Sequence, residues 1–251
     1  MSPVPCAEQL ARALDEDALA LAYQPIVRLA DGRVEGVEAL LRWDDVPAEQ
    51  AVALAGEAGL LGRLGAWVLH RALGDLARWR AAPAAQHLTV SVNVSPLQLD
   101  DPGFARMVNL ELARHDLPAD ALVLELTEAG RLAPGAGRVV GALRRLGVAI
   151  SIDDLGVGDA TALRVLGLPA GELKFELDVL ERVSGVGGTF AALVQRAVEG
   201  GLRGVVERIE TREQLAAAVS AGCTHAQGFL LGRPAQAADV PRQVAERRPL
   251  G

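Results

Sequence analysis

Short apolar runs alternate with amphipathic helical patterns along most of this chain of 251 residues. Eight of the runs have the length and composition of buried strands, and they cover residues 19–27, 34–41, 88–94, 122–126, 148–152, 172–175, 204–206 and 226–231. Strands that alternate with helices pair in parallel through crossover connections. Eight such strands within 251 residues predict an α/β fold of the (β/α)8, TIM-like barrel type.

The first connection of this barrel is expected to be irregular. Residues 30–33 read Ala-Asp-Gly-Arg, which is typical of a hairpin turn, so the first two strands should be antiparallel. We expect one barrel domain over residues 19–245, preceded by a short helical segment in residues 1–18. Helical spacing of apolar residues predicts further helices over 67–79, 139–146 (ended by Gly147), 190–197 and 213–219.

Composition excludes several classes of function. The net charge of −7 and the aromatic content of 3% argue against binding to a DNA or RNA polymer or to an anionic membrane. Cys6 and Cys223 are too far apart to form a CxxC motif, and the N-terminus lacks the pattern of a signal peptide. Residues 81–99, the longest uncharged stretch, contain two prolines and read as loop plus strand. These features predict a cytoplasmic protein.

Asp153 and Asp154 stand side by side at the end of the apolar run 148–152. Two carboxylates held so close together repel each other, and a cation between them relieves that repulsion. This pair therefore suggests a metal site.

Nearly every predicted strand ends in, or is followed by, a polar residue suited to metal binding or acid–base chemistry. These residues are Gln24, Glu38, Asn93, Glu125, Asp153 with Asp154, Lys174, Glu207 and Gln227. The carboxyl ends of barrel strands converge on one face, where active sites lie. Carboxylate and amide oxygens suit hard ions such as Mg²⁺ or Mn²⁺. The four histidines are scattered, so each is predicted to be a surface or helix residue and a zinc hydrolase is disfavoured.

Each of these residues also has a simpler structural interpretation when it is taken alone. Glu38 could pair with Arg42, and Asn93 could cap the next turn together with Ser95. Glu125 could belong to a capping box, and Lys174 could be a solvated residue at a strand end. Only the joint pattern, with one such residue per strand end, favours a shared site.

The residues also resemble, in order along positions 22–234, the motifs of the EAL family of cyclic di-GMP phosphodiesterases. A three-letter motif alone means little, whereas an ordered series of this length is specific. The matching segments are Tyr23-Gln24-Pro25-Ile26-Val27, Glu38-Ala39-Leu40-Leu41-Arg42, Ser91-Val92-Asn93-Val94-Ser95, Glu125-Leu126-Thr127-Glu128, Asp153-Asp154-Leu155-Gly156, Lys174-Phe175-Glu176, Glu207-Arg208-Ile209-Glu210-Thr211 and Gln227-Gly228-Phe229.

This resemblance implies hydrolysis of one phosphodiester bond of cyclic di-GMP to linear pGpG in bacterial signalling, with two Mg²⁺ or Mn²⁺ ions per site. The implied ligands of the first ion are Glu38, Asn93, Glu125 and Asp153. Those of the second ion are Asp153, Asp154 and Glu207.

The resemblance also implies roles for five further residues. Lys174 would position or help deprotonate the attacking water. Positioning or charge stabilisation is favoured, because an ammonium among so many carboxylates stays protonated. Gln227 would assist in the site, and Glu128 would anchor the loop after Asp154. Gln24 and Arg42 would contact the substrate. A homodimer across the barrel rim is expected by resemblance as well.

The sequence departs from the family pattern in the loop after the aspartate pair and beside Glu207. Leu155, Val157 and Asp159 stand where Phe, Thr and Tyr are common, Glu176 stands where Asp is usual, and Arg208 replaces a glycine. The metal-ligand set itself is complete.

Three interpretations follow from these departures. The first is an active phosphodiesterase. The second is a catalytically weak or inactive domain that binds cyclic di-GMP as a sensor or binds a protein partner. The third is another metal-dependent barrel hydrolase, such as a glycosidase, which the scarcity of aromatic residues disfavours.

Overall fold

The chain opens its barrel with an antiparallel hairpin of two nine-residue strands, β1 (Ala20–Arg28) and β2 (Val34–Arg42). The backbone N–H of Arg28 donates to the carbonyl of Arg33 at 2.8 Å, which closes the turn. Gly32 lies in that turn at φ 71°, a left-handed conformation that favours glycine. The predicted antiparallel first pair is confirmed.

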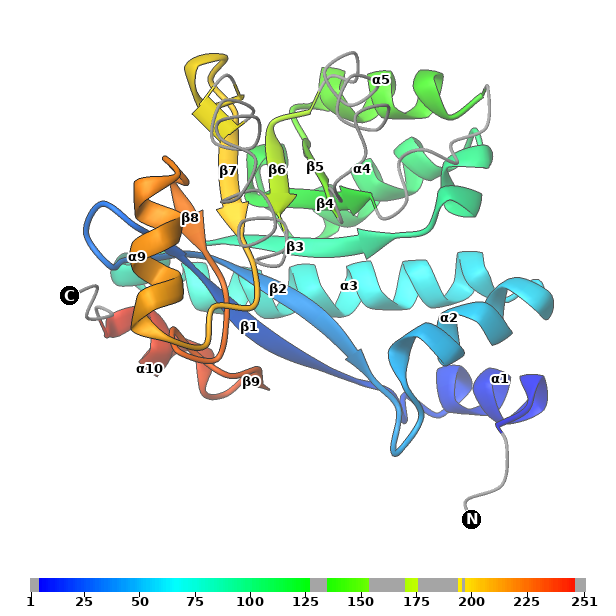
Figure 1. Ribbon diagram of the computed structural model, residues 1–251. Coiled ribbons are helices and arrows are strands. Elements are labelled where there is room, and N and C mark those ends of the chain that lie inside the picture. Colours follow the sequence, from blue (N-terminus) through cyan, green and yellow to red (C-terminus); the bar gives the residue numbers. More distant parts are fainter. Residues whose placement is uncertain (1–4, 127–134, 154–169, 176–193, 196, 247–251) are drawn as a thin grey trace.

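The computed structural model describes residues 5–126, 135–153, 170–175, 194–195 and 197–246. From β2 onward the strands pair in parallel in chain order, and the last of them pairs antiparallel with β1, which closes the barrel (Figure 1). These strands are β3 (Thr89–Val94), β4 (Leu122–Leu126), β5 (Ala149–Ile152), β6 (Glu172–Phe175), β7 (Arg203–Val206) and β8 (His225–Ala226). The predicted TIM-like barrel is therefore confirmed.

The eighth strand is much shorter than the predicted 226–231. After β8 the chain leaves the barrel and packs against Ile209, whose backbone N–H donates to the carbonyl of Gln227 at 3.1 Å. A Cβ atom on Gly228 would lie 2.1 Å from the carbonyl oxygen of Ile209, so only glycine permits this approach. A further short strand that the sequence did not predict, β9 (Ala235–Gln236), pairs with β1.

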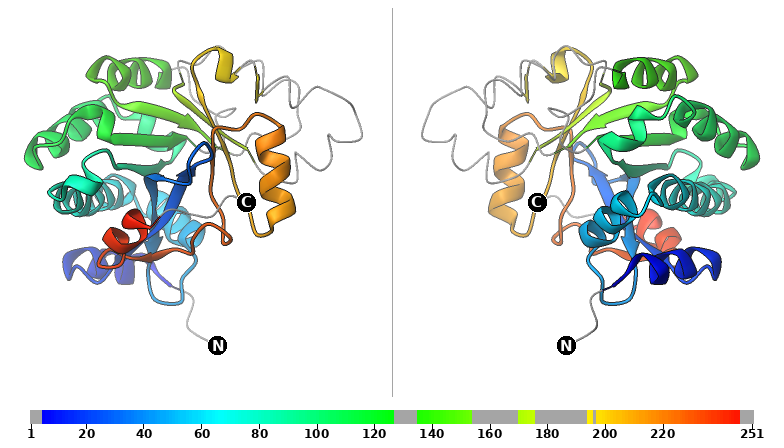
Figure 2. Two further views of the ribbon diagram at one scale, coloured as in Figure 1. Left: turned by 90° about the vertical axis from the view of Figure 1, so that its left-hand side faces the viewer. Right: turned by 90° about the vertical axis from the view of Figure 1, so that its right-hand side faces the viewer.

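Helices lie around the outside of the strands, as both views of Figure 2 show. The α-helices among the described residues are α1 (Ala7–Asp15), α2 (Ala48–Glu57), α3 (Leu61–Arg80), α4 (Phe104–Arg114), α5 (Ala136–Leu146), α9 (Arg212–Ser220) and α10 (Val240–Ala245). The short 3-10 helices of the described residues are η1 (Pro83–Ala85), η2 (Pro96–Asp100) and η3 (Ala119–Ala121). The segments predicted as helical at 67–79 and 213–219 fall inside α3 and α9, and most of 190–197 lies outside the described residues.

The longest helix in the described part of the chain, α3, packs against the hairpin from outside the barrel. Leu73 and Leu76 on its inner face are fully buried. The ring of Trp79 meets the ring of Tyr23 edge to face at 4.7 Å, and the Tyr23 hydroxyl donates to the buried carboxylate of Asp75. Because Tyr23 lies on β1 next to Gln24, this packing fixes the strand that carries the first candidate residue. No helix in the described part of the chain has the length and apolar character needed to cross a membrane.

Candidate active site

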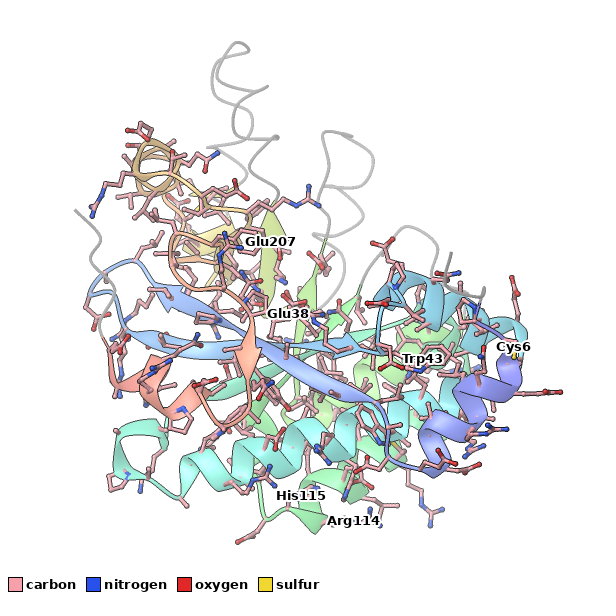
Figure 3. All side chains as sticks on the ribbon, turned by 90° about the horizontal axis from the view of Figure 1, so that it is seen from below. Cys6, Glu38, Trp43, Arg114, His115 and Glu207 are labelled. Carbon is pink, nitrogen blue, oxygen red and sulfur yellow. The ribbon has the colours of Figure 1, made fainter. Side chains whose placement is uncertain are left out.

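Strand register brings the predicted polar residues to one end of the barrel. Parallel pairing sets Asn93 beside Glu125, and antiparallel pairing sets Gln24 opposite Glu38. Glu207 directly follows β7, and its backbone N–H donates to the carbonyl of Phe175, the last residue of β6, which places Glu207 close to Lys174 on the neighbouring strand. In Figure 3, Glu38 and Glu207 lie on the same side of the barrel.

Lys174 is the centre of the cluster. Its ammonium nitrogen lies 2.7 Å from Glu207 Oε1, 2.9 Å from Glu125 Oε2 and 3.2 Å from Glu38 Oε2. The Lys174 and Glu125 side chains have no solvent exposure, while Glu38 and Glu207 are 9% and 16% exposed. The earlier alternative of a solvated lysine is therefore wrong. Among the chain's 25 basic residues Lys174 is the single lysine, a signal that the motif-based reasoning did not use.

Two amides complete the surroundings of Glu38. Asn93 Nδ2 donates to its Oε1 at 2.8 Å, and Gln227 Nε2 donates to its Oε2 at 2.8 Å. Gln227 Nε2 also lies 3.2 Å from Gln24 Oε1, so the hairpin is linked to the residue that follows the last barrel strand. Glu38 is thus bonded to Lys174, Asn93 and Gln227, and the Arg42 guanidinium donates to the carbonyl of Leu41 at 2.9 Å.

Burial and nearby charges shift the pKa values of the three glutamates in this cluster, Glu38, Glu125 and Glu207. Burial raises the pKa of Glu125 well above its usual value, and the nearby Glu38 carboxylate adds to the rise. Burial would also raise the pKa of Glu38, but the Lys174 ammonium and the two amide donors outweigh it and leave that pKa lowered. Burial, together with Asp153 and Glu38, raises the pKa of Glu207 to about 7 against the opposing effect of Lys174.

Lys174 itself stays charged. Burial alone lowers the pKa of its ammonium, whereas the carboxylates of Glu125, Glu38 and Glu207 raise that pKa well above its usual value. A lysine in this state donates hydrogen bonds and carries positive charge, but it does not accept a proton.

The cluster opens into a cleft of about 810 Å³ at the C-terminal face. Asp153, Arg42 and Gln24 contribute to the lining of the cleft, together with Glu38, Asn93, Glu207 and Gln227. Arg42 is exposed and stands at the end of β2. An apolar wall of the cleft comes from α2, α3 and the turn after β8, and it is made of Ala48, Val52, Leu61, Leu64, Val68 and Phe229.

The donor set fits a hard divalent cation. Carboxylate and amide oxygens from several strands face one cleft, and no histidine is among its lining residues. Within the described part of the chain, Glu125 Oε1 and Gln227 Oε1 are buried without a hydrogen-bond partner. A buried acceptor without a partner is costly, and a bound cation or its water would satisfy both atoms.

The structure brings together eight of the sequence-predicted site residues, namely Gln24, Glu38, Asn93, Glu125, Asp153, Lys174, Glu207 and Gln227. Arg42 lies in the lining of the same cleft. Asp154 and Glu128 lie outside the described residues, as do the substituted positions 155, 157, 159 and 176.

Sequence reasoning missed two features of the cleft. The apolar wall includes Val52 on α2, a helix rich in alanine whose pattern was too weak to predict. Arg208 has a left-handed backbone at φ 57°, which explains why glycine is the usual residue there but puts strain on arginine.

Comparison with known proteins identifies similar sequences over most of the chain. The EAL domain model matches residues 7–234. The chain is 36% identical over 246 residues to the bifunctional diguanylate cyclase/cyclic di-GMP phosphodiesterase MucR of Pseudomonas aeruginosa, which covers 94% of this chain and 36% of MucR. It is 32% identical over 229 residues to the cyclic di-GMP phosphodiesterase PA2567 of the same organism, which covers 87% of this chain and 39% of that protein. The chain therefore spans little more than a third of either relative.

A solved structure is similar to this chain in fold as well as in sequence. The phosphodiesterase part of PaMucR, in complex with c-di-GMP, is 35% identical to this chain and superimposes with a TM-score of 0.83. The match covers 93% of this chain and 98% of that one.

Proposed function

Because this chain belongs to the EAL domain family, we propose that it hydrolyses one phosphodiester bond of cyclic di-GMP to give linear pGpG. The observation that carries the proposal is the buried Lys174 ammonium among Glu38, Glu125 and Glu207 at the open end of the barrel. The substrate is supported by the names of two relatives that describe cyclic di-GMP phosphodiesterases.

The carboxylates need more positive charge than Lys174 supplies, which supports a metal-dependent reaction. The residues that would hold a first Mg²⁺ or Mn²⁺ ion are Glu38, Asn93, Glu125 and Asp153. Those that would hold a second ion are Asp153, Asp154 and Glu207. Such ions supply charge neutralisation, phosphate binding and a lowered pKa for an attacking water.

Lys174 would act as a fixed cation in this reaction. Since the surrounding carboxylates keep its ammonium protonated, it would hold the attacking water by hydrogen bonding and stabilise negative charge that develops on the phosphate. Gln227, which is buried and bonded to Glu38, would keep that carboxylate oriented.

The residues that line the cleft support a nucleotide substrate. Arg42 and Gln24 stand at its polar side, where they would contact a phosphate and its ribose. The apolar wall that includes Val52 and Phe229 would receive a guanine base.

A sensor is the second candidate function, and Arg208 is the observation that favours it. Its side chain shares the cleft with Glu207, and its backbone is strained at φ 57°. Such strain next to a metal ligand could displace the ligand and lower turnover while binding of cyclic di-GMP persists.

The first experiment is turnover of cyclic di-GMP by the purified chain with Mn²⁺ and then with Mg²⁺, next to calorimetric binding with Ca²⁺. Formation of pGpG supports the enzyme, whereas tight binding without turnover supports the sensor. Glu38→Ala should abolish turnover, and Glu57→Ala, at the exposed end of α2, should leave it unchanged. An undiminished rate for Glu38→Ala would contradict the assignment of metal ligands.

Three further properties belong to the same proposal. Residues 19–245 would form the single barrel domain, with residues 1–18 as its lead-in. The protein would act in the cytoplasm, where cyclic di-GMP signalling takes place. It would form a homodimer across the barrel rim, a state that its molecular mass in solution can test.

A further inference from the structure

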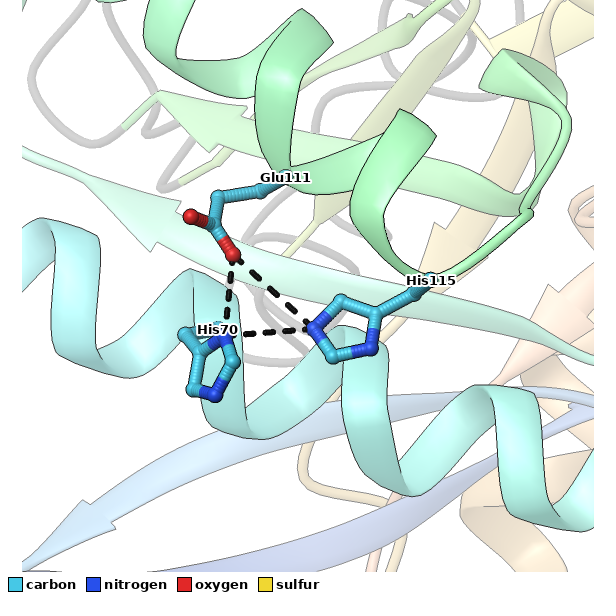
Figure 4. A group of neighbouring side chains, drawn as sticks. All are labelled: His70, Glu111 and His115. Atoms are coloured by element: carbon cyan, nitrogen blue, oxygen red, sulfur yellow. Dashed lines mark hydrogen bonds and ion pairs between the residues drawn. The ribbon is translucent and has the colours of Figure 1, made fainter.

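Two histidines that are far apart in the sequence meet on the outside of the barrel. His70 lies on α3, and His115 caps the C-terminus of α4 one helical turn after Glu111 (Figure 4). His70 Nδ1 lies 3.0 Å from Glu111 Oε2 and 3.2 Å from His115 Nε2, and His115 Nε2 lies 3.8 Å from Glu111 Oε2. Two imidazole nitrogens and one carboxylate oxygen thus converge on a single point.

The spacing of these three atoms matches a tetrahedral metal site. Donors bound at about 2.05 Å to a tetrahedral zinc ion lie about 3.3 Å from each other. The three observed separations of 3.0, 3.2 and 3.8 Å fall on both sides of that value. An ion could therefore enter between the side chains with only small rotations.

The surroundings hold these donors in place. The Glu111 and His115 side chains are 11% and 16% exposed, while His70 is 52% exposed and leaves the site open to solvent. A Cβ atom on Gly74 would lie 3.2 Å from His115 Cε1, so this glycine of α3 gives the imidazole its room. Arg114 Nη1 donates to Glu111 Oε1 at 2.9 Å, which orients the carboxylate and leaves Oε2 facing the histidines. The same nitrogen lies 3.5 Å from His70 Nδ1, a weak contact that a bound ion would replace.

We propose that His70, Glu111 and His115 bind a divalent transition-metal ion of the zinc class, with water at the fourth position. Two imidazoles and one carboxylate form the ligand set of open tetrahedral zinc sites, and imidazole suits zinc far better than magnesium. This site is separate from the cleft, because Figure 3 places His115 and Arg114 beyond α3, away from Glu38 and Glu207.

The consequence for the fold is a cross-link between α3 and α4. An ion held by both helices stabilises the native state, since the site is not formed in the unfolded chain. At an ion concentration 100 times the Kd, a domain of this size gains about 5 to 10 °C in Tm. Metal binding at these three residues is independent of the proposed hydrolysis.

Cobalt titration tests the site on the whole chain. The protein is stripped with chelator and kept in excess Mg²⁺, which occupies the hard donors of the cleft, and Co²⁺ is then added. Four-coordinate Co²⁺ gives intense visible bands, unlike six-coordinate Co²⁺. We expect these bands in the wild type and at least ~10-fold weaker binding in His70→Ala, whose side chain is half exposed and removable without loss of the fold.

Two more variants, a Zn²⁺ count and a Tm comparison make the result decisive. His115→Gln should lose the bands as well, and His87→Ala, a histidine away from the cluster that bonds to Arg33, should keep them. The wild type should bind one more Zn²⁺ per chain than His70→Ala, and its Zn²⁺-dependent rise in Tm should be larger. Equal Zn²⁺ counts in the two proteins, or no visible bands in the wild type, would overturn the proposal.

Discussion

The ammonium nitrogen of Lys174 lies 2.9 Å from Glu125 Oε2, and neither side chain has any contact with solvent. A buried ion pair of this kind is costly to desolvate, so it needs further partners to be tolerated. Glu38 and Glu207 supply them, but three carboxylates then surround one cation. Lys174 therefore holds together a cluster whose remaining negative charge is suited to attract metal ions.

Lys174→Met should destabilise the metal-free protein. The methionine removes the cation that contacts all three carboxylates, and loss of one partner of a buried ion pair costs about 3–5 kcal/mol. Saturating Mn²⁺ should restore part of the loss, because it supplies the missing positive charge. Urea unfolding with chelator and with Mn²⁺ measures both effects.

Arg63→Met is the matched control for that experiment. It removes the Arg63–Asp15 ion pair, whose side chains are 50% and 66% exposed, and such surface pairs contribute at most about 1 kcal/mol. Equal losses of unfolding free energy in the two variants, or no effect of Mn²⁺ on Lys174→Met, would show that Lys174 does not neutralise the surrounding carboxylates.

The raised pKa of Glu207, about 7, predicts a pH dependence of stability. The native state keeps a proton on this carboxyl between its ordinary pKa of 4.5 and about 7, where the unfolded chain has already lost it. The stabilising contribution is complete below pH 4.5 and disappears as the pH rises through about 7. The loss is roughly 3 kcal/mol by the usual conversion.

This pH effect can be isolated with Glu207→Gln. Glu125 contributes in the same direction and Glu38 in the opposite one, so only the difference between the wild type and this variant reports on Glu207. In chelator, from pH 5 to 8, the wild type should lose more unfolding free energy than Glu207→Gln. Parallel pH profiles of the two proteins would rule out the assigned titration.

Much of the site could be predicted because strand-end position has a simple sequence signature. Glu125 and Lys174 each lie at or near the end of a short apolar run, and parallel pairing brings such ends together whatever the details of the helices. The path of the chain after Ala226 could not be predicted in this way. It depends on the contact of Gly228 with Ile209, which is a tertiary feature.

The features that escaped prediction are those that depend on tertiary contacts or on weak local patterns. His70 and His115 come from two helices whose separation in sequence gives no metal-ligand spacing. Helix α2 buries mainly Ala51 and Ala55, whose small side chains give little hydrophobic contrast. The strain at Arg208 is visible only in backbone dihedral angles.

Tyr23→Phe should destabilise the barrel by about 1–3 kcal/mol. The Tyr23 hydroxyl donates to Asp75, a carboxylate that is 2% exposed, and hydrogen bonds to buried charged groups contribute this much. Phenylalanine keeps the edge-to-face contact with Trp79, so only the hydrogen bond is removed. Urea unfolding gives the difference, and a change below about 0.5 kcal/mol would mean that Arg78 alone satisfies Asp75.

Arg208→Gly tests whether backbone strain beside Glu207 lowers the stability of the protein and its turnover of cyclic di-GMP. Arginine at φ 57° costs about 1–2 kcal/mol relative to an ordinary conformation, and glycine adopts that angle freely. We expect Arg208→Gly to gain up to about 1 kcal/mol of unfolding free energy, after the higher entropy of glycine in the unfolded chain is subtracted. Turnover of cyclic di-GMP should also rise if the strain displaces Glu207.

Arg208→Ala separates strain from charge. Alanine removes the guanidinium but keeps a Cβ atom, so it leaves the strained backbone unrelieved. If strain is the defect, only the glycine variant gains stability and turnover. If the positive charge next to Glu207 is the defect, both variants gain turnover to a similar extent. Equal turnover in the wild type and both variants would locate any loss of activity elsewhere, and the substitutions at Leu155, Val157 and Asp159 would then be the next to revert.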